Sequence, residues 1–467
     1  MKKFLLIICF ISFFILSCDL NNSKNNNPRR SISWSIPDGE KKEYELGEEN
    51  EFYAQNLTTY KHYSLKANLR YIGEYCNVWL EKDNDIHQIA IDTIGKAYDE
   101  DIYPKLMEYF GTEFELEDGN TYNTMQIADF MGNYDGKLCI LLLDIIDGYT
   151  QGRGYVAGYF SSLNFYDNYP GVPSNKRDMI YIDTHPGTPG DDTSKEIVAH
   201  EMQHLMNFVT RQMLSEFNNQ PSQMDLWINE GLSAAAEWSV FGHSKSRIDD
   251  YNSDRGRTIA KGNNFFVWDQ HRNESVLDDY STVYLFFQWL RLQNDTQIYK
   301  KIIESNYPDY RAVTENTIGY TNYNWGELIG DWLRANFVNS PTGIHGYRGD
   351  PAFNNLAKHY IINDNNSLNV SLFPGEGVFS YSPTPLTTVP NPSGNIRYIN
   401  IKLENNNARL TYNVNPLNRG RAETGTITGQ TPPGTNTSSL SRSILSGSYI
   451  PYAISIEEML RRNHNFN

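Results

Sequence analysis

Two histidines and a glutamate lie within five residues of each other and could bind and use a metal ion. His200, Glu201 and His204 form the pattern His-Glu-x-x-His inside residues 194–208, a stretch whose composition favours a helix. Positions four apart share one helix face, so both imidazoles can reach one ion. Glu201 lies a short arc away, where its carboxylate can take a proton from a metal-activated water. The pattern therefore indicates metal-assisted hydrolysis.

A hydrolytic zinc site needs three protein ligands and one open position for water. Metzincins take the third ligand from a histidine six residues after the second, with a glycine between them. This chain has Asn207 and Thr210 at those two positions, which excludes that class. The best candidate for the third ligand is Glu230, on a second predicted helix at about residues 224–240.

The combination of these two motifs resembles the gluzincins, whose third zinc ligand is a glutamate on a later helix. Trp-Ile-Asn-Glu-Gly-Leu-Ser at 227–233 makes the chain most similar to the hyicolysin-type bacterial metallopeptidases, over about residues 137–292. The resemblance implies an α+β metallopeptidase domain with a mixed sheet and active-site helices. It also implies one Zn²⁺ per chain, bound by the two histidines and Glu230. No Gly-x-Met-x-Asn motif precedes the first histidine, which argues against an aminopeptidase and favours an endopeptidase.

Further residues receive roles from the same resemblance. Glu201 would be the general base and would deliver its proton to the leaving amine. Tyr280, at a helix start, would stabilise the oxyanion, with Tyr284 as a rival and ordinary packing as the alternative for both. Glu237 and Asn229 would support the zinc ligands, Glu237 by accepting a hydrogen bond from one of the histidines. A solvated surface position remains the alternative for Glu237.

The strand expected at residues 155–160 is a candidate for substrate binding. In gluzincins the strand next but one before the metal-binding helix is a sheet edge that pairs with an extended substrate. That position corresponds here to Ala157, Gly158 and Tyr159. Gly158 would let a substrate backbone approach closely.

The first residues predict export and lipid attachment. Lys2 and Lys3 precede an apolar run at residues 4–16, which is too short to span a bilayer comfortably. Residues 1–17 then read as a lipoprotein signal peptide with Cys18 as the lipidated residue; an ordinary signal peptide is the alternative. No later stretch is apolar enough to span a bilayer, so we expect a lipid-anchored protein of the cell envelope or surface.

Composition shifts divide the remaining chain into four expected segments. A polar tether at 18–43 precedes an N-terminal β unit at 44–84, whose residues alternate apolar and polar. The zinc metallopeptidase catalytic domain is expected at 85–345. A C-terminal β-rich domain is expected at 346–467, where Pro, Gly, Ser, Thr and Asn become frequent.

Two cysteines remain after the signal peptide and the lipid site are set aside. An exported compartment permits a disulfide between Cys76 and Cys139, and two buried free thiols are the equal alternative. Neither residue has Cys-x-x-Cys spacing, which argues against a thiolate zinc site.

The net charge of the chain limits the classes of molecule that it could bind. A net charge of −16 without a Lys/Arg-rich tract argues against a nucleic-acid binder. We expect a monomer that acts on a protein or peptide substrate and meets the membrane through the lipid on Cys18. One alternative is a surface lipoprotein that binds a host or envelope ligand on a catalytically silent peptidase fold. Another is a zinc hydrolase of substrates other than peptides.

Overall fold

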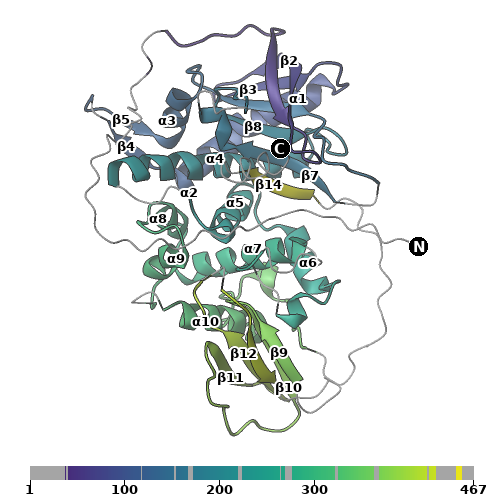
Figure 1. Ribbon diagram of the computed structural model, residues 1–467, viewed down its shortest axis with the longest axis vertical. Helices are drawn as coiled ribbons and strands as arrows, with labels where there is room; N and C mark the ends of the chain where they lie inside the picture. Colours follow the sequence, from purple (N-terminus) through teal and green to yellow (C-terminus); the bar gives the residue numbers. More distant parts are fainter. Residues whose placement is uncertain are drawn as a thin grey trace.

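The chain folds into a sheet-containing end, a helical middle and a small β unit at the opposite end (Figure 1). The computed structural model describes residues 37, 40–116, 118–151, 154–166, 172–218, 223–262, 265–268, 276–320, 324–361, 368–417, 420–427 and 449–454. The predicted signal peptide, the lipidation site at Cys18 and most of the tether lie outside these residues.

A seven-stranded mixed sheet forms the upper end, in the order β1-β2-β3-β6-β8-β7-β14. Strands β3, β6 and β8 run parallel, whereas β7 is antiparallel to β8. β6 is apolar and buried on both faces, as its continuous apolar run predicts for a central strand. The strands are β1 Glu49–Gln55, β2 His62–Ile72, β3 Cys76–Glu81, β6 Leu138–Leu143, β7 Tyr155–Ser161, β8 Met179–Asp183 and β14 Tyr449–Ile454.

The strands expected at residues 44–84 form, but they are not a separate N-terminal unit. β3 pairs in parallel with β6, so the first three strands continue the sheet that leads to the metal-binding helix. Phe52, Trp79 and Leu141 share one buried cluster across the expected boundary. A boundary near residue 84 would cut both this cluster and the strand pairing, which sequence composition alone does not reveal.

The two cysteines are buried free thiols. In the β3–β6 pair, Cys76 lies opposite Leu138, and Cys139 lies opposite Asn77. The cysteines are therefore one register position apart, and successive side chains of a strand point to opposite faces. They belong to different core clusters on either side of the sheet, so no disulfide joins them.

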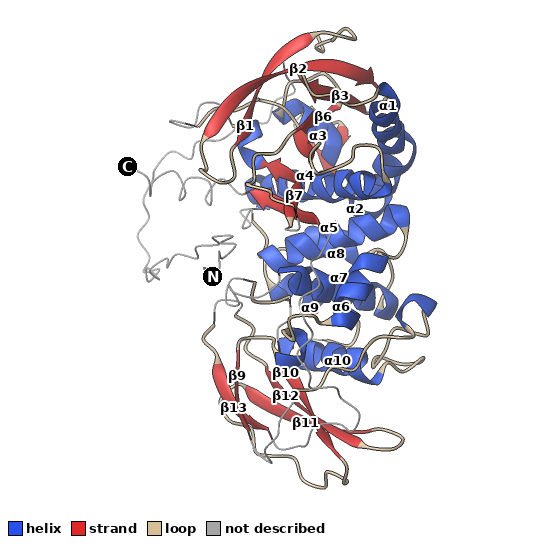
Figure 2. Cartoon of the chain, turned by 90° about the vertical axis from the view of Figure 1, so that its right-hand side faces the viewer, coloured by secondary structure: helices blue, strands red, loops and turns tan. Residues whose placement is uncertain are grey.

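Helices cover one face of the sheet and then extend into the middle of the molecule (Figure 2). α4 (Asp192–Asn218) packs on β7 and β8, and α5 (Leu226–Phe241) packs between α4 and α7 (Val276–Gln293). The other helices are α1 Gln88–Ala97, a π-helix Tyr98–Ile102, α2 Tyr103–Phe110, α3 Thr124–Met131, α6 Lys245–Ser253, α8 Ile298–Ile303, α9 Tyr310–Asn316 and α10 Trp325–Val338. A hairpin of β4 (Glu113–Glu115) and β5 (Thr121–Asn123) precedes α3.

The C-terminal β-rich region has two parts that lie far apart in the fold. Two small sheets form the lower unit, with orders β10-β12-β11 and β13-β9. Their strands are β9 Leu368–Leu372, β10 Gly377–Ser382, β11 Ile396–Lys402, β12 Asn407–Asn413 and β13 Glu423–Ile427. β14 instead returns to the large sheet, where it runs parallel to β7. The prediction of a single C-terminal domain at 346–467 is therefore wrong in its last part, because β14 belongs to the large sheet.

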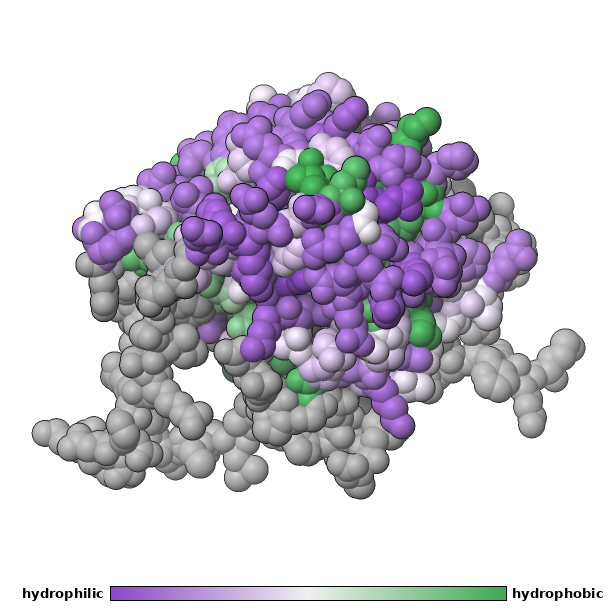
Figure 3. All heavy atoms as spheres, turned by 90° about the horizontal axis from the view of Figure 1, so that it is seen from above, coloured by the Kyte–Doolittle hydropathy of each residue, from purple (hydrophilic) through white to green (hydrophobic). Residues whose placement is uncertain are grey.

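The described surface is mostly hydrophilic. The face seen in Figure 3 is largely hydrophilic, with only small groups of hydrophobic residues. Exposed large hydrophobic side chains are scattered along the described chain, as at Leu46, Ile89 and Ile318. Within the described residues, every helix is too short or too polar to cross a bilayer.

Candidate metal centre

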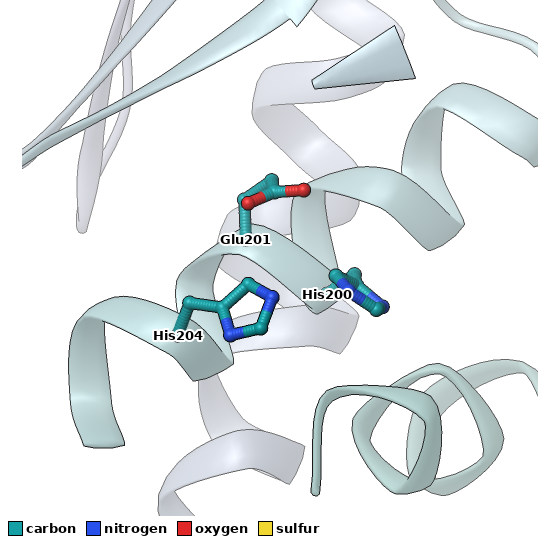
Figure 4. A group of neighbouring side chains, drawn as sticks. All are labelled: His200, Glu201 and His204. Atoms are coloured by element: carbon teal, nitrogen blue, oxygen red, sulfur yellow. The ribbon is translucent and has the colours of Figure 1, made fainter. Parts of the chain in front are cut away.

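The predicted motif lies in the buried middle of α4. Asp191 accepts a hydrogen bond at its Oδ1 from the Ser194 amide (2.7 Å) and so caps the helix. His200, Glu201 and His204 follow about two turns later and are essentially inaccessible to solvent. Figure 4 shows the two imidazoles side by side on this helix, with Glu201 next to them. One candidate ligand atom from each of the three lies within 4.8 Å of the others.

The carboxylate of Glu230 on α5 faces both imidazoles. Its Oε2 lies 3.2 Å from Nε2 of His200 and 3.6 Å from Nε2 of His204. Burial lowers the pKa of His200, but its hydrogen bonds to Glu230 and Glu237 outweigh burial and raise that pKa to about 9. Burial likewise opposes ionisation of Glu230, and the histidines outweigh it and lower its pKa to about 2. A negative carboxylate thus sits between the two ring nitrogens.

Ser233 orients His204, a contact that the sequence reasoning missed. The Ser233 hydroxyl donates to Oε1 of Gln203 (2.6 Å) and lies 3.0 Å from Nδ1 of His204. Because its only proton goes to Gln203, Ser233 accepts from a protonated Nδ1, and the neutral ring then carries its lone pair on Nε2. The available signal was spacing, since Ser233 follows Glu230 by three residues on one helix face.

The set of donors fits a zinc ion. Nε2 of His204 is buried and makes no hydrogen bond within the described structure. A buried acceptor of this kind is costly unless something binds it. Two imidazole nitrogens and one carboxylate are a donor set that zinc takes in hydrolytic sites. His200, His204 and Glu230 are therefore the residues that could hold the metal.

Glu237 supports His200 rather than His204. Its Oε1 lies 2.7 Å from Nδ1 of His200 and 3.4 Å from the Arg247 guanidinium. Burial raises the pKa of Glu237, but Arg247 and His200 outweigh that effect, and the net pKa is lowered. The solvated alternative for Glu237 is wrong, because its side chain is buried. Arg247, on α6, was not anticipated from the sequence.

Asn229 does not join this network in the way that was expected. Its Oδ1 accepts a hydrogen bond from Nδ2 of Asn207 (2.6 Å), and no histidine contact accompanies it among the described residues. The bond fastens α5 to α4 beside the site. Gly231, next to Glu230, lets α7 pack closely against α5. A Cβ at this position would lie 2.1 Å from the Phe287 ring of α7.

The two tyrosine candidates lie in different surroundings. The Tyr280 ring lies 6.5 Å from the His200 ring, and the guanidinium of Arg247 lies 4.7 Å from the centre of the Tyr280 ring. The Tyr284 hydroxyl instead accepts from the Ser244 amide (3.1 Å) and lies 3.3 Å from Nδ1 of His243. Burial raises the pKa of both tyrosines, so both stay protonated at neutral pH. The geometry favours Tyr280 as the donor at the site.

The predicted substrate edge is already covered in this structure. β14 pairs in parallel with β7, with Pro451 opposite Gly158 and Tyr452 opposite Tyr159. The prediction that Ala157, Gly158 and Tyr159 form a free sheet edge is therefore wrong for this conformation. The strand that covers them follows more than 280 residues later in the chain, and nothing local predicts it.

The packing of β7 against its neighbours accounts for Gly158 and Tyr159. A Cβ on Gly158 would lie 2.6 Å from Cγ2 of Ile197 and 3.3 Å from Cγ of Glu201, so the glycine admits α4 rather than a substrate. The Tyr159 ring stacks on Tyr181 at 4.2 Å in the cluster on the other face of the sheet. Gly158 thus sets how closely Glu201 approaches the sheet.

The chain is similar to a known metalloprotease along most of its length. The chain is 29% identical over 370 residues to the neutral metalloprotease ShpI of Staphylococcus hyicus. The matched region covers 76% of this chain and 77% of that relative. No known family model matches the chain. The similarity supports a bacterial metallopeptidase, which is a hydrolase that acts on peptide bonds.

Proposed function

We propose that this chain is a zinc-dependent endopeptidase whose metal ion is bound by His200, His204 and Glu230. The observation that carries the proposal is the convergence of Glu230 Oε2 on both Nε2 atoms, beside a buried His204 nitrogen that has no hydrogen bond. A bound zinc ion would supply a Lewis acid that polarises the scissile carbonyl and acidifies a water molecule. The similarity to a metalloprotease supports a peptide substrate.

Side chains of this protein would transfer the protons and stabilise the negative charge that develops during the reaction. Glu201, within 4.8 Å of both histidines, takes the proton of the attacking water and passes it to the leaving amine. Tyr280 donates to the oxyanion of the tetrahedral intermediate. The hydrogen bonds that the two imidazoles donate to Ser233 and Glu237 hold the rings in the orientation that the reaction needs.

Removal of the metal tests this function most directly. Purified protein should contain about one zinc per chain and should cleave an unstructured protein such as casein. A chelator should abolish cleavage, and zinc should restore it, because the residual groups cannot polarise the carbonyl strongly enough. Cleavage that persists in metal-free protein would overturn the zinc mechanism. Stoichiometric zinc without cleavage of any protein or peptide would instead favour a silent fold or a different substrate.

We also propose that the enzyme is exported and anchored in the cell envelope through lipid on Cys18. The basic residues and the short apolar run before Cys18 support the proposal. Cys18→Ala should move the protein from the membrane fraction to the soluble fraction and should remove the lipid mass from its N-terminal peptide. An unchanged membrane fraction and unchanged N-terminal mass would contradict lipidation.

Access of an extended substrate to β7 requires β14 to leave its place. A chain that ends after Ile427 lacks β14, so a substrate strand could pair with the exposed edge of β7. We expect this truncation to raise kcat/KM for a long peptide by at least about tenfold, and to change it less for a dipeptide amide too short to pair with the edge. Equal effects on both substrates would show that β14 does not compete with an extended substrate.

A further inference from the structure

Three buried aspartates lie together away from the metal centre. Asp129 belongs to α3, Asp135 to the turn before β6, and Asp178 immediately precedes β8. They are 4%, 8% and 1% exposed, and one carboxylate oxygen from each lies within 4.8 Å of the others. Three carboxylates this close repel one another strongly when ionised, because burial removes the screening by water.

The surrounding hydrogen bonds and the nearby charges of Lys41 and Arg177 offset only part of the repulsion between these carboxylates. Asp129 accepts from the Gly136 amide (2.7 Å), and Asp135 accepts from the Lys137 amide (2.8 Å) and the Asn133 amide group (2.8 Å). Oδ1 of Asp178 is buried and has no hydrogen-bond partner among the described residues. No Lys or Arg side chain within the described ranges lies within 4 Å of these carboxylates.

Lys41 and Lys137 line the pocket beside the cluster, and a third cationic side chain, Arg177, is turned towards aromatic rings. Arg177 adjoins Asp178 in sequence, yet its guanidinium lies 4.7 Å from the Phe52 ring centre and 5.3 Å from that of Trp79. Burial, followed by the charges of Asp135 and Asp129, holds the pKa of Asp178 well above its usual range. The cluster therefore needs either a proton or a bound cation to be stable.

We propose that Asp129, Asp135 and Asp178 bind a divalent cation of the calcium class. Carboxylate oxygens are the hard ligands that Ca²⁺ prefers, and the cluster contains no His or Cys that would favour zinc. Oδ1 of Asn133 is also buried and makes no hydrogen bond in the described structure, so a further oxygen is at hand. Among the described residues, a carboxylate oxygen of the 1%-exposed Asp178 has no hydrogen-bond partner, which distinguishes this site from an ordinary acidic surface.

A pocket gives the cation a route to the cluster. It has a volume of about 540 Å³, and both Asp129 and Asp178 line it. Tyr75, Tyr103 and Tyr134 line the same pocket, so aromatic rings stand close to the proposed site. A cation there would join α3, the turn before β6 and the start of β8, which leads through a short loop to α4. It would therefore stabilise the scaffold of the metal centre without taking part in the reaction.

Terbium luminescence tests the site in the zinc-loaded, full-length protein. Tb³⁺ replaces Ca²⁺ at oxygen sites, and excitation of the lining tyrosines should sensitise its emission. We expect saturable emission that Ca²⁺ displaces, and a Ca²⁺-dependent rise of a few degrees in Tm. Asp178→Asn should weaken Tb³⁺ binding by about tenfold or more, because it removes one ligand charge. The matched control Asp192→Asn changes an aspartate whose side chain is 93% exposed on α4, and it should change neither readout.

The alternative outcomes are distinct. If the aspartates are instead held together by protons, Ca²⁺ will leave the wild-type Tm unchanged and no displaceable emission will appear. Asp178→Asn would then raise Tm in calcium-free buffer, because an amide replaces a carboxyl that is costly to bury. Either that pattern or equal Tb³⁺ affinity for Asp178→Asn and wild type would overturn the proposal. None of these readouts depends on peptidase activity, so they remain separate from the test of the zinc mechanism.

Discussion

Glu201→Gln should reduce kcat for peptide cleavage by about 10²- to 10⁴-fold while one zinc ion stays bound. The amide keeps the shape of the side chain but cannot accept the proton of the attacking water. The three proposed ligands keep the contacts that Glu230 and Glu237 make with the histidines. Steady-state cleavage of casein or a quenched peptide measures the rate, and metal analysis measures the bound zinc.

The neighbouring Glu196 provides the matched control for this substitution. It lies on the same helix, five residues earlier, and has no assigned role. Glu196→Gln should therefore cleave at close to the wild-type rate. A Glu201→Gln enzyme that is equally active would disprove the general-base role. A Glu201→Gln enzyme that loses its zinc would show that Glu201 is a ligand, and the assignment of Glu230 would then fail.

Glu230→Gln should weaken zinc binding more than any change to a residue that only supports the ligands. The substitution removes the negative oxygen that lies 3.2 Å and 3.6 Å from the two ring nitrogens. Loss of a carboxylate that supports a ligand costs about 10- to 100-fold in metal affinity, so loss of a ligand itself should exceed about 100-fold. Competition with a chromophoric zinc chelator measures both affinities.

Glu237→Gln supplies the graded comparison on the same helix. Its carboxylate contacts His200 from the far side and would not touch the metal, so we expect a loss of about 10- to 100-fold. Unfolding of the metal-free proteins separates binding from folding, because Glu237 also pairs with Arg247. If Glu237→Gln weakened zinc binding more than Glu230→Gln, the two glutamates would have their roles exchanged.

The peptidase function is better supported than the alternative of a ligand-binding protein on a silent fold. Similarity to a metalloprotease over about three quarters of both chains favours a hydrolase of peptide bonds. The intact donor set of His200, His204 and Glu230 gives no sign of a degenerate site. A ligand-binding role for the lower β unit is compatible with catalysis in the upper part, and the zinc and cleavage measurements decide whether the fold is active.

The sequence by itself determined the chemistry of the site. His200 and His204 share a helix face because the α-helical period places positions four apart together, whatever the rest of the chain does. Glu230, Ser233 and Glu237 likewise share one face of the next helix. Glu230 was assigned as the third ligand from the resemblance of its motif to that of known metallopeptidases, and its contacts with both histidines follow that expectation.

Tertiary structure decided how these faces meet and what surrounds them. Only the packing of α5 on α4 places Glu237 on His200, Ser233 on His204 and Asn229 on Asn207. Long-range strand pairing places the N-terminal strands in the main sheet and β14 over the expected substrate edge. Cys76 pairs with Leu138, 62 positions later, and Tyr155 pairs with Tyr449, 294 positions later, so local propensity carries no information about these pairings. The spacing of residues thus identified the reactive groups, and the packing determined which side chains hold them and which strand covers the expected substrate edge.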